Sequence, residues 1–245
     1  MLNVIGELEK NKPTVLFLSG GNVSPCVYDQ LESDGVFQFA VIDYCRSEPP
    51  WDVTSLGKRV AEFIVTAELG QVVLAGWSAG GVISMAAASM HPELISGMLL
   101  SNTGPCAKNH GNPDLPKRVL EQWGNRDFFD SLLKGWFSRP VPPLLRLKLL
   151  DYMDQVEREC AFQITTSVRQ VDFREGLKRF HKPVVLAHGS LDKSRTMEHV
   201  NMILEAMPQT KVFFMEAGHT SVVESKAEWQ EALWALLEQV KMDIL

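Results

Sequence analysis

The stretch GWSAG at residues 76–80 follows a run of β-branched and apolar residues, Gln71–Ala75, and precedes a run of small apolar residues, Ala79–Met90. The first run is typical of a buried strand, and the second is typical of a helix packed closely against a sheet. A serine with glycine two positions away on each side fits a sharp strand-to-helix turn, because such a turn has no room for larger neighbours. The turn would lift the hydroxyl of Ser78 above the sheet edge, beside a helix N-terminus that favours developing negative charge. We therefore predict that Ser78 is a nucleophile.

Short β-branched runs alternate with helical stretches along most of the chain, which predicts a mainly parallel sheet with crossover helices. The runs are almost continuously apolar, as in strands that are covered on both faces. The predicted strands are Thr14–Ser19, Phe37–Asp43, Gln71–Ala75, Gly97–Asn102, Pro183–His188 and Lys211–Met215. Helices are predicted over Asp52–Leu69, over Ala79–Met90 and in the C-terminal stretch from Trp229 to Val240. The predicted fold class is therefore α/β, with a mainly parallel central sheet flanked by helices.

Residues 105–182 break this alternation. They open on PCAKNHGNPDLP at residues 105–116 and then become largely helical. A helical insertion between two parallel strands usually lies over the carboxyl ends of the strands, where ligands bind in open α/β sheets. We therefore predict a core of residues 1–104 and 183–245, with a helical cap over residues 105–182. Four cap aromatics either line a substrate pocket or hold the cap helices together: Phe128, Phe129, Trp136 and Phe137.

The charge of the chain is unevenly distributed. The 245 residues carry a net charge of −6, which argues against a nucleic-acid-binding protein. Residues 105–182 hold 14 basic and 10 acidic residues, a net of +4, so the remainder carries −10. A basic cap over an acidic body would steer an anionic substrate or an acidic partner to the site. A solvated helical surface explains the same imbalance equally well.

Other sequence patterns argue against a membrane span, a signal peptide, a metal site and a cofactor. No apolar run approaches the roughly 18 residues that span a bilayer, and residues 1–12 lack the apolar centre of a signal peptide. We therefore expect a cytoplasmic protein that does not bind membranes. The 4 cysteines form no C-x-x-C pair, and no two histidines have metal-binding helical spacing, so we expect neither a metal nor a cofactor. His110 has no motif around it, and His188 is expected to make a local hydrogen bond within its strand.

The turn at residues 76–80 and its setting resemble the α/β-hydrolase superfamily, and the resemblance extends over nearly all of the chain. In that superfamily an acid and then a histidine follow the serine, each just after a later strand. AHGSLD at residues 187–192 resembles the acid segment, and AGH at residues 217–219 resembles the histidine loop. The resemblance thus implies a catalytic triad of Ser78, His219 and Asp192. His219 would take the proton of Ser78, and Asp192 would orient the imidazole and stabilise its cation.

An oxyanion hole requires two backbone N–H groups. Ala79, directly after the nucleophile, would supply one of them. Many family members have His-Gly-x after the first of these strands, where SGGN stands here at residues 19–22. This alignment implies Gly21 as the second donor, with Asn22 as the alternative. The chain departs from the family pattern at residues 43–47, DYCRS, which lack the usual glycines, and its N-terminus is too short for the full initial hairpin.

The resemblance implies a serine hydrolase that cleaves the carboxylic ester of a small acyl substrate through an acyl-enzyme. GWSAGG together with a cap of this size is similar to the pimeloyl-carrier-protein methyl ester esterases of biotin synthesis. In those enzymes an acidic acyl carrier protein delivers the acyl group to basic cap residues. Lactonases and thioesterases share the same motifs. A non-hydrolytic lyase and a ligand receptor on the same fold also remain open, because a fold does not dictate a function.

Overall fold

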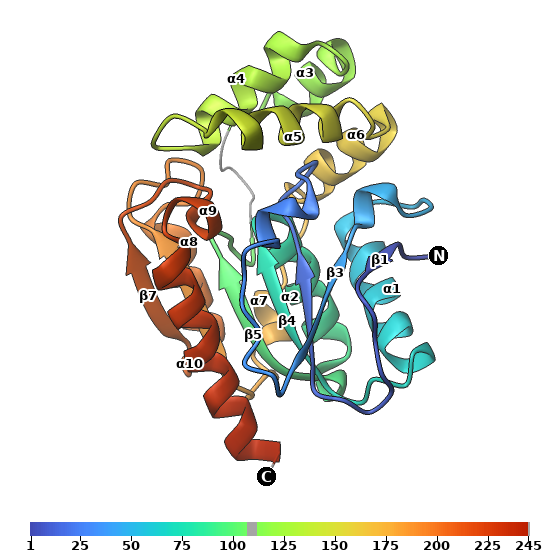
Figure 1. Ribbon diagram of the computed structural model, residues 1–245, viewed down its shortest axis with the longest axis vertical. Coiled ribbons are helices and arrows are strands. Elements are labelled where there is room, and N and C mark those ends of the chain that lie inside the picture. The colour runs from blue at the N-terminus through green and yellow to red at the C-terminus, as the bar shows by residue number, and fades with distance from the viewer. Residues whose placement is uncertain (107–111, 245) are drawn as a thin grey trace.

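A seven-stranded sheet with helices on both faces forms the centre of the computed structural model, which describes residues 1–106 and 112–244 (Figure 1). The strand order is β1-β3-β2-β4-β5-β6-β7, and β1 pairs antiparallel with β3 while the other pairs are parallel. The strands are β1 (Val4–Ile5), β2 (Thr14–Leu18), β3 (Gln38–Ile42), β4 (Val72–Trp77), β5 (Ile95–Ser101), β6 (Val184–Gly189) and β7 (Lys211–Met215). The predicted fold class is confirmed.

The six predicted strands correspond to β2–β7, with ends that differ by at most two residues. Strand β1 was not predicted, because two residues are too short to produce an alternating pattern. The helices are α1 (Val53–Thr66), α2 (Ala79–Met90), α3 (Leu115–Gln122), α4 (Arg126–Trp136), α5 (Pro143–Met153), α6 (Arg158–Ser167), α7 (Arg174–Leu177), α8 (Met197–Ala206), α9 (Ser221–Glu224) and α10 (Lys226–Ile244). Short 3-10 turns occur at η1 (Pro25–Tyr28), η2 (Tyr44–Arg46) and η3 (Pro92–Leu94).

Different helices cover the two faces of the sheet. A Cβ atom on Gly97 of β5 would lie 2.8 Å from Val240 of α10, and one on Gly76 of β4 would lie 2.5 Å from the backbone of Gly80 in α2. Gly97 pairs with Val73, and residues three apart on a strand point to opposite faces. Helix α10 therefore covers one face and α2 covers the other. Helices α1, α7 and α8 belong to the face of α2, because α1 and α7 contact α2 and α7 contacts α8.

Helices α3–α6, here called the cap helices, lie beyond the carboxyl ends of the parallel strands (Figure 1). Helix α7 also belongs to the predicted segment 105–182, yet it contacts α2 and α8 of the core. The cap boundaries at residues 105 and 182 stay a prediction. Lys108, which was counted in the cap charge, and His110 lie outside the described residues. In the part of the chain that the structure describes, no helix is both long and apolar enough to cross a bilayer.

Candidate active site

Ser78 occupies the predicted sharp turn between β4 and α2. Its backbone has φ 53° and ψ −117°, a conformation that costs free energy in a residue other than glycine. Two hydrogen bonds hold the residue there. The N–H of Ser78 donates to the carbonyl of Ser101 at 2.9 Å, and the hydroxyl of Thr103 donates to the carbonyl of Ser78 at 2.7 Å. Both partners come from the end of the neighbouring strand β5 and the loop after it, so the sheet itself fixes the position of the serine.

Gly80, two residues after Ser78, is required by close packing. A Cβ atom on Gly80 would lie 2.0 Å from the carbonyl oxygen of Leu18 at the end of β2. Backbone atoms cannot move aside as the end of a flexible side chain can, so a larger residue at this position would push α2 away from the sheet. The spacing of GWSAG therefore reflects the room available between two strands and the first turn of a helix.

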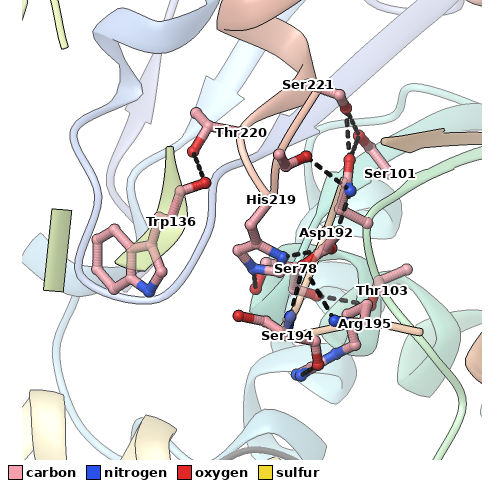
Figure 2. A network of polar contacts seen from close by, with 12 residues as sticks. Ser78, Ser101, Thr103, Trp136, Asp192, Ser194, Arg195, His219, Thr220 and Ser221 are labelled. Carbon is pink, nitrogen blue, oxygen red and sulfur yellow. Dashed lines mark hydrogen bonds and ion pairs between the residues drawn. The ribbon is translucent and has the colours of Figure 1, made fainter. Parts of the chain in front are cut away.

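The three side chains of the predicted triad form one hydrogen-bonded chain (Figure 2). His219 Nε2 lies 2.8 Å from Ser78 Oγ, and His219 Nδ1 lies 2.8 Å from Asp192 Oδ2. A carboxylate only accepts hydrogen bonds, so Nδ1 carries the proton and Nε2 is free to accept from the serine hydroxyl. Ser78 follows β4, Asp192 follows β6 and His219 follows β7. The three residues meet because parallel strands end at the same edge of the sheet.

Each oxygen of the Asp192 carboxylate accepts two hydrogen bonds. Oδ1 accepts from the backbone N–H groups of Ser194 at 2.7 Å and Arg195 at 3.1 Å. Oδ2 accepts from His219 and, at 2.9 Å, from the side-chain amide of Asn102. Burial by itself would raise the pKa of Asp192, but the charge of His219 and these hydrogen bonds lower it to about 2. The carboxylate is therefore ionised across the neutral pH range, as a partner of the imidazole must be.

Asn102 is a site residue that the sequence did not reveal as one. It is fully buried, with φ 44°, directly after β5. Its Nδ2 donates to Asp192 and also, at 3.2 Å, to the carbonyl of Gly218, while its Oδ1 accepts from the hydroxyl of Ser221. The amide thus connects the acid to the loop that carries His219. The available signal was its place at the end of a predicted strand, which does not distinguish it from other polar residues at strand ends.

Trp77 and Glu224 hold the histidine loop from two sides. The indole N–H of Trp77 donates to the carbonyl of His219 at 2.6 Å. One carboxylate oxygen of Glu224 accepts from the N–H of Gly218 at 2.8 Å. The other oxygen accepts from the N–H of Ser138, in the loop after α4, at 2.7 Å. The hydroxyl of Thr220 donates to the carbonyl of Trp136 at the end of α4, at 3.2 Å (Figure 2). The loop that carries His219 is therefore tied both to β4 and to the chain that leaves cap helix α4.

Gly21 and Ala79, the predicted oxyanion donors, lie close together beside Ser78. A Cβ atom on Gly21 would lie 3.5 Å from the Cβ of Ala79, and both residues line the same cavity as Ser78. Asn22 also lines this cavity, has φ 63° and is 5% exposed. Its Oδ1 has no hydrogen-bond partner among the described residues. The assignment of Gly21 as the second donor stays a prediction, with Asn22 as its alternative.

The cavity beside Ser78 and His219 has a volume of about 240 Å³ and is roofed by the cap helices. Of the four cap aromatics considered from sequence, Trp136 lines this cavity. Phe128 and Phe129 are instead buried in the cap, where Phe129 packs edge-on against Trp123 with ring centroids 4.8 Å apart. The expectation that these rings hold the cap together therefore applies to this pair, whereas Trp136 faces the space where a substrate would bind.

His188 lies in β6 as predicted, but its expected local hydrogen bond is absent on one side of the ring. Nδ1 of His188 is buried without a hydrogen-bond partner among the described residues. Its ring packs edge-on against Phe214 at 6.1 Å, and burial lowers its pKa. Throughout residues 1–106 and 112–244, no group of three or more histidine, cysteine, aspartate or glutamate side chains is arranged to hold a metal ion.

Comparisons with known proteins agree with this architecture. Residues 15–232 match the model of a family described as the alpha/beta hydrolase family. AB hydrolase superfamily protein YisY of Bacillus subtilis is 24% identical over 233 residues, an alignment that covers 86% of this chain and 87% of the relative. The pimeloyl-[acyl-carrier protein] methyl ester esterase of Klebsiella pneumoniae is 26% identical over 190 residues, which covers 69% of this chain and 71% of the relative.

Solved structures show the same fold. The enol-lactonase of Burkholderia xenovorans superposes with a TM-score of 0.85 at 17% identity, covering 97% of this chain and 96% of that one. An esterase of Exiguobacterium antarcticum superposes with a TM-score of 0.84 at 19% identity, covering 98% of this chain and 94% of that one.

Proposed function

The chain belongs to the alpha/beta hydrolase family, and from this premise we propose that it is a serine hydrolase that cleaves a carboxylic ester through an acyl-enzyme. The observation that carries the proposal is the hydrogen-bonded chain from Ser78 through His219 to Asp192, which opens on a cavity large enough for a small acyl group. A serine hydroxyl becomes a nucleophile when a base accepts its proton and a third group orients that base. These three side chains stand in that relationship.

Acylation begins when Ser78 Oγ attacks the ester carbonyl carbon and His219 Nε2 takes the hydroxyl proton. Asp192 stabilises the resulting imidazolium through its hydrogen bond to Nδ1. The carbonyl oxygen becomes an oxyanion, which accepts hydrogen bonds from the backbone N–H groups of Gly21 and Ala79. The intermediate then collapses, the bond from the carbonyl carbon to the alkoxy oxygen breaks, and His219 protonates the departing alcohol.

Deacylation repeats these roles with water in place of the serine. His219 removes a proton from a water molecule that attacks the acyl carbon, and it returns the proton to Ser78 Oγ as the acid departs. Ala79 is the first residue of α2, so the positive end of the helix dipole lies beside the oxyanion in both steps. The fixed backbone conformation of Ser78 keeps these groups aligned throughout the cycle.

Labelling followed by a substrate panel tests this proposal. A fluorophosphonate probe should modify the wild-type protein and leave Ser78→Ala unmodified. The protein should then hydrolyse at least one class among methyl esters, lactones and thioesters of short acyl chains. Turnover of lactones or thioesters in preference to methyl esters would select a lactonase or a thioesterase. Labelling without turnover of any of the three would favour a lyase or a receptor and would contradict hydrolysis.

A carrier-linked substrate is a second candidate, favoured by the net +4 of residues 105–182 and by the similarity to pimeloyl-carrier esterases. Acyl carrier proteins are acidic, so a basic cap would attract them. Hydrolysis of a carrier-linked acyl methyl ester should then slow as salt rises from about 0.05 to 0.5 M, because screening weakens exposed charge pairs. Equal and salt-independent rates on the free methyl ester and on its carrier-linked form would contradict delivery by a carrier.

A further inference from the structure

Three arginines line the cavity that contains Ser78 and His219. Arg118 comes from α3, Arg169 follows α6, and Arg195 lies in the loop between β6 and α8. Two of them therefore come from the cap and one from the core. Figure 2 shows Arg195 beside Ser194, below the Ser78–His219 pair. Three segments that are distant in sequence thus bring positive charge to one small space.

Arg169 and Arg195 have no carboxylate partner among the described residues. Arg195 donates from Nη1 to the carbonyl of Ser194 at 2.9 Å. Arg169 donates from Nη1 to the carbonyl of Thr165 at 2.5 Å and from Nη2 to the carbonyl of Asn112 at 3.4 Å. The Nε atoms of both arginines are buried and have no hydrogen-bond partner in the described part of the chain. Each guanidinium, which has five N–H donors, therefore keeps unused donors.

Other basic residues of the cap behave differently. Arg126 pairs with Asp151 and Asp154, both Lys134 and Arg146 pair with Asp130, and Arg174 pairs with Asp172. Arg118 packs its guanidinium over the ring of Phe128, 5.1 Å from the ring centre, and forms no ion pair among the residues that the structure describes. Many charges of the cap are thus neutralised at the surface, whereas Arg118 and Arg169 of the cap and Arg195 of the core have no ion-pair partner among the described residues.

Asp192 lies three residues before Arg195, yet it has no capacity left to pair with the guanidinium. Each of its oxygens already accepts two hydrogen bonds, which fills the sites that a carboxylate offers. The pKa of Arg195 is lowered to about 10, mainly by burial. The negative charge of Asp192 raises this pKa, and the positive charge of Arg169 lowers it further. Burial also lowers the pKa of Arg169. A guanidinium is too basic to lose its proton near neutral pH, so both side chains carry their charge there.

Partly buried cations without a counter-ion are costly, and such an arrangement is typical of sites where a ligand supplies the opposite charge. Guanidinium groups bind carboxylates through two parallel hydrogen bonds, which gives both affinity and orientation. We propose, on the basis of the ester hydrolysis proposed above, that Arg169 and Arg195, with Arg118 on the cavity wall, bind a carboxylate at the far end of the acyl substrate. The substrate class is then a half ester or a lactone of a dicarboxylic acid.

The size of the cavity favours a short chain for that acid. Its volume of about 240 Å³ lies below the roughly 300–1,000 Å³ of pockets that hold drug-sized ligands. The ester carbonyl must reach Ser78 while the carboxylate reaches the arginines within the same space. Glutarate, with five carbons, is therefore the probe of choice.

A pair of esters that differ only in charge tests the site by kinetics. The nitrophenyl monoester of glutaric acid should show a kcat/KM about 10- to 100-fold higher than the nitrophenyl ester of glutaric acid monoamide, mainly through a lower KM. Arg169→Gln and Arg195→Gln should bring this ratio toward one. Arg195→Lys keeps the charge and should retain part of the preference. Arg158→Gln, at an exposed position of α6 outside the cavity, removes the same charge and should keep the ratio.

Binding to the Ser78→Ala protein tests the carboxylate site without catalysis. Glutarate should raise its melting temperature, glutaric acid monoamide should raise it less, and Arg195→Gln in the same background should abolish the difference. Stabilisation by inorganic phosphate but not by glutarate would overturn the assignment to a carboxylate. Equal kcat/KM for the two esters together with no stabilisation by glutarate would overturn the site altogether. If neither ester is hydrolysed, the proposed esterase function fails, while the glutarate measurement still decides the carboxylate site.

Discussion

Asn102 Nδ2 lies 2.9 Å from Asp192 Oδ2, the same carboxylate oxygen that accepts the hydrogen bond of His219. The orientation of this amide is fixed by two further contacts, because its oxygen accepts from Ser221 and its NH₂ group also reaches the carbonyl of Gly218. Asn102 is thus a positioning residue, which holds the acid in place while the acid holds the histidine.

Replacing Asn102 should therefore weaken catalysis without preventing substrate binding. Asn102→Ala should lower kcat about 10-fold or more and leave KM within a few-fold, because the acid loses a donor that fixes its geometry. In Asn102→Thr the threonine hydroxyl can still donate a hydrogen bond, so kcat should fall less than in Asn102→Ala. Steady-state kinetics on a nitrophenyl ester measures both effects. A large rise in KM with unchanged kcat would contradict a positioning role.

Removing the nucleophile should abolish turnover while leaving the fold intact. Ser78→Ala should reduce kcat by at least about 10⁴-fold, because the remaining groups of a triad cannot act without the nucleophile. Ser84→Ala provides a matched control, since Ser84 lies in the same helix α2 and its hydroxyl bonds only the carbonyl of Gly80 among the described residues. This control should retain activity within a few-fold, and circular dichroism should show both variants folded. Wild-type activity in Ser78→Ala would refute the assignment.

The low pKa of Asp192 should appear as a pH-dependent contribution to stability. The folded pKa of about 2 lies below the ordinary value of 3.8, so the contribution is complete above about pH 4 and is lost as pH falls toward 2. A shift of this size corresponds to about 2 kcal/mol. Denaturant unfolding at pH 5 and pH 2.5 should therefore show a smaller loss of stability in Asp192→Asn than in the wild type. Other carboxylates titrate in both proteins and cancel in the comparison, and equal losses would show that Asp192 is not held as an anion.

Glu224 should stabilise the contact between the histidine loop and the chain after α4. Its carboxylate accepts from the N–H groups of Gly218, Ser138 and Arg139 and from the hydroxyl of Ser138, so Glu224→Ala leaves four donors without this partner. The free energy of unfolding should fall by about 1–3 kcal/mol, and kcat should fall with it. Glu216→Ala is the control, because Glu216 is exposed and makes a surface ion pair with Arg139 at 3.4 Å. That variant should lose less than about 1 kcal/mol, and an equal loss in both variants would contradict the role of Glu224.

Local patterns in the sequence were enough to predict the sheet and the order of its strands along the chain. A strand that is buried on both faces must be apolar along its length, and a turn that leads directly into a helix must be flanked by small residues. Both requirements act over fewer than about ten residues, so they leave a visible trace in the sequence. The placement of Ser78, Asp192 and His219 just after strands followed from those traces. Strand β1 left none, because its two residues are held by pairing with β3.

The tertiary structure alone decided which polar groups outside the predicted triad contact it. Asn102 reaches Asp192 across 90 residues of chain, a relationship that no local pattern encodes. The charges of the cap likewise depend on the tertiary structure and not on the sequence alone. Counting residues gave a basic cap, but ion pairs form through space, and several of the cap's cations are paired at the surface. Arg169 and Arg195 face the cavity without a carboxylate partner in the described residues. This follows from how the cap packs on the sheet, because an arginine is neutralised by the groups it contacts and not by its neighbours in sequence.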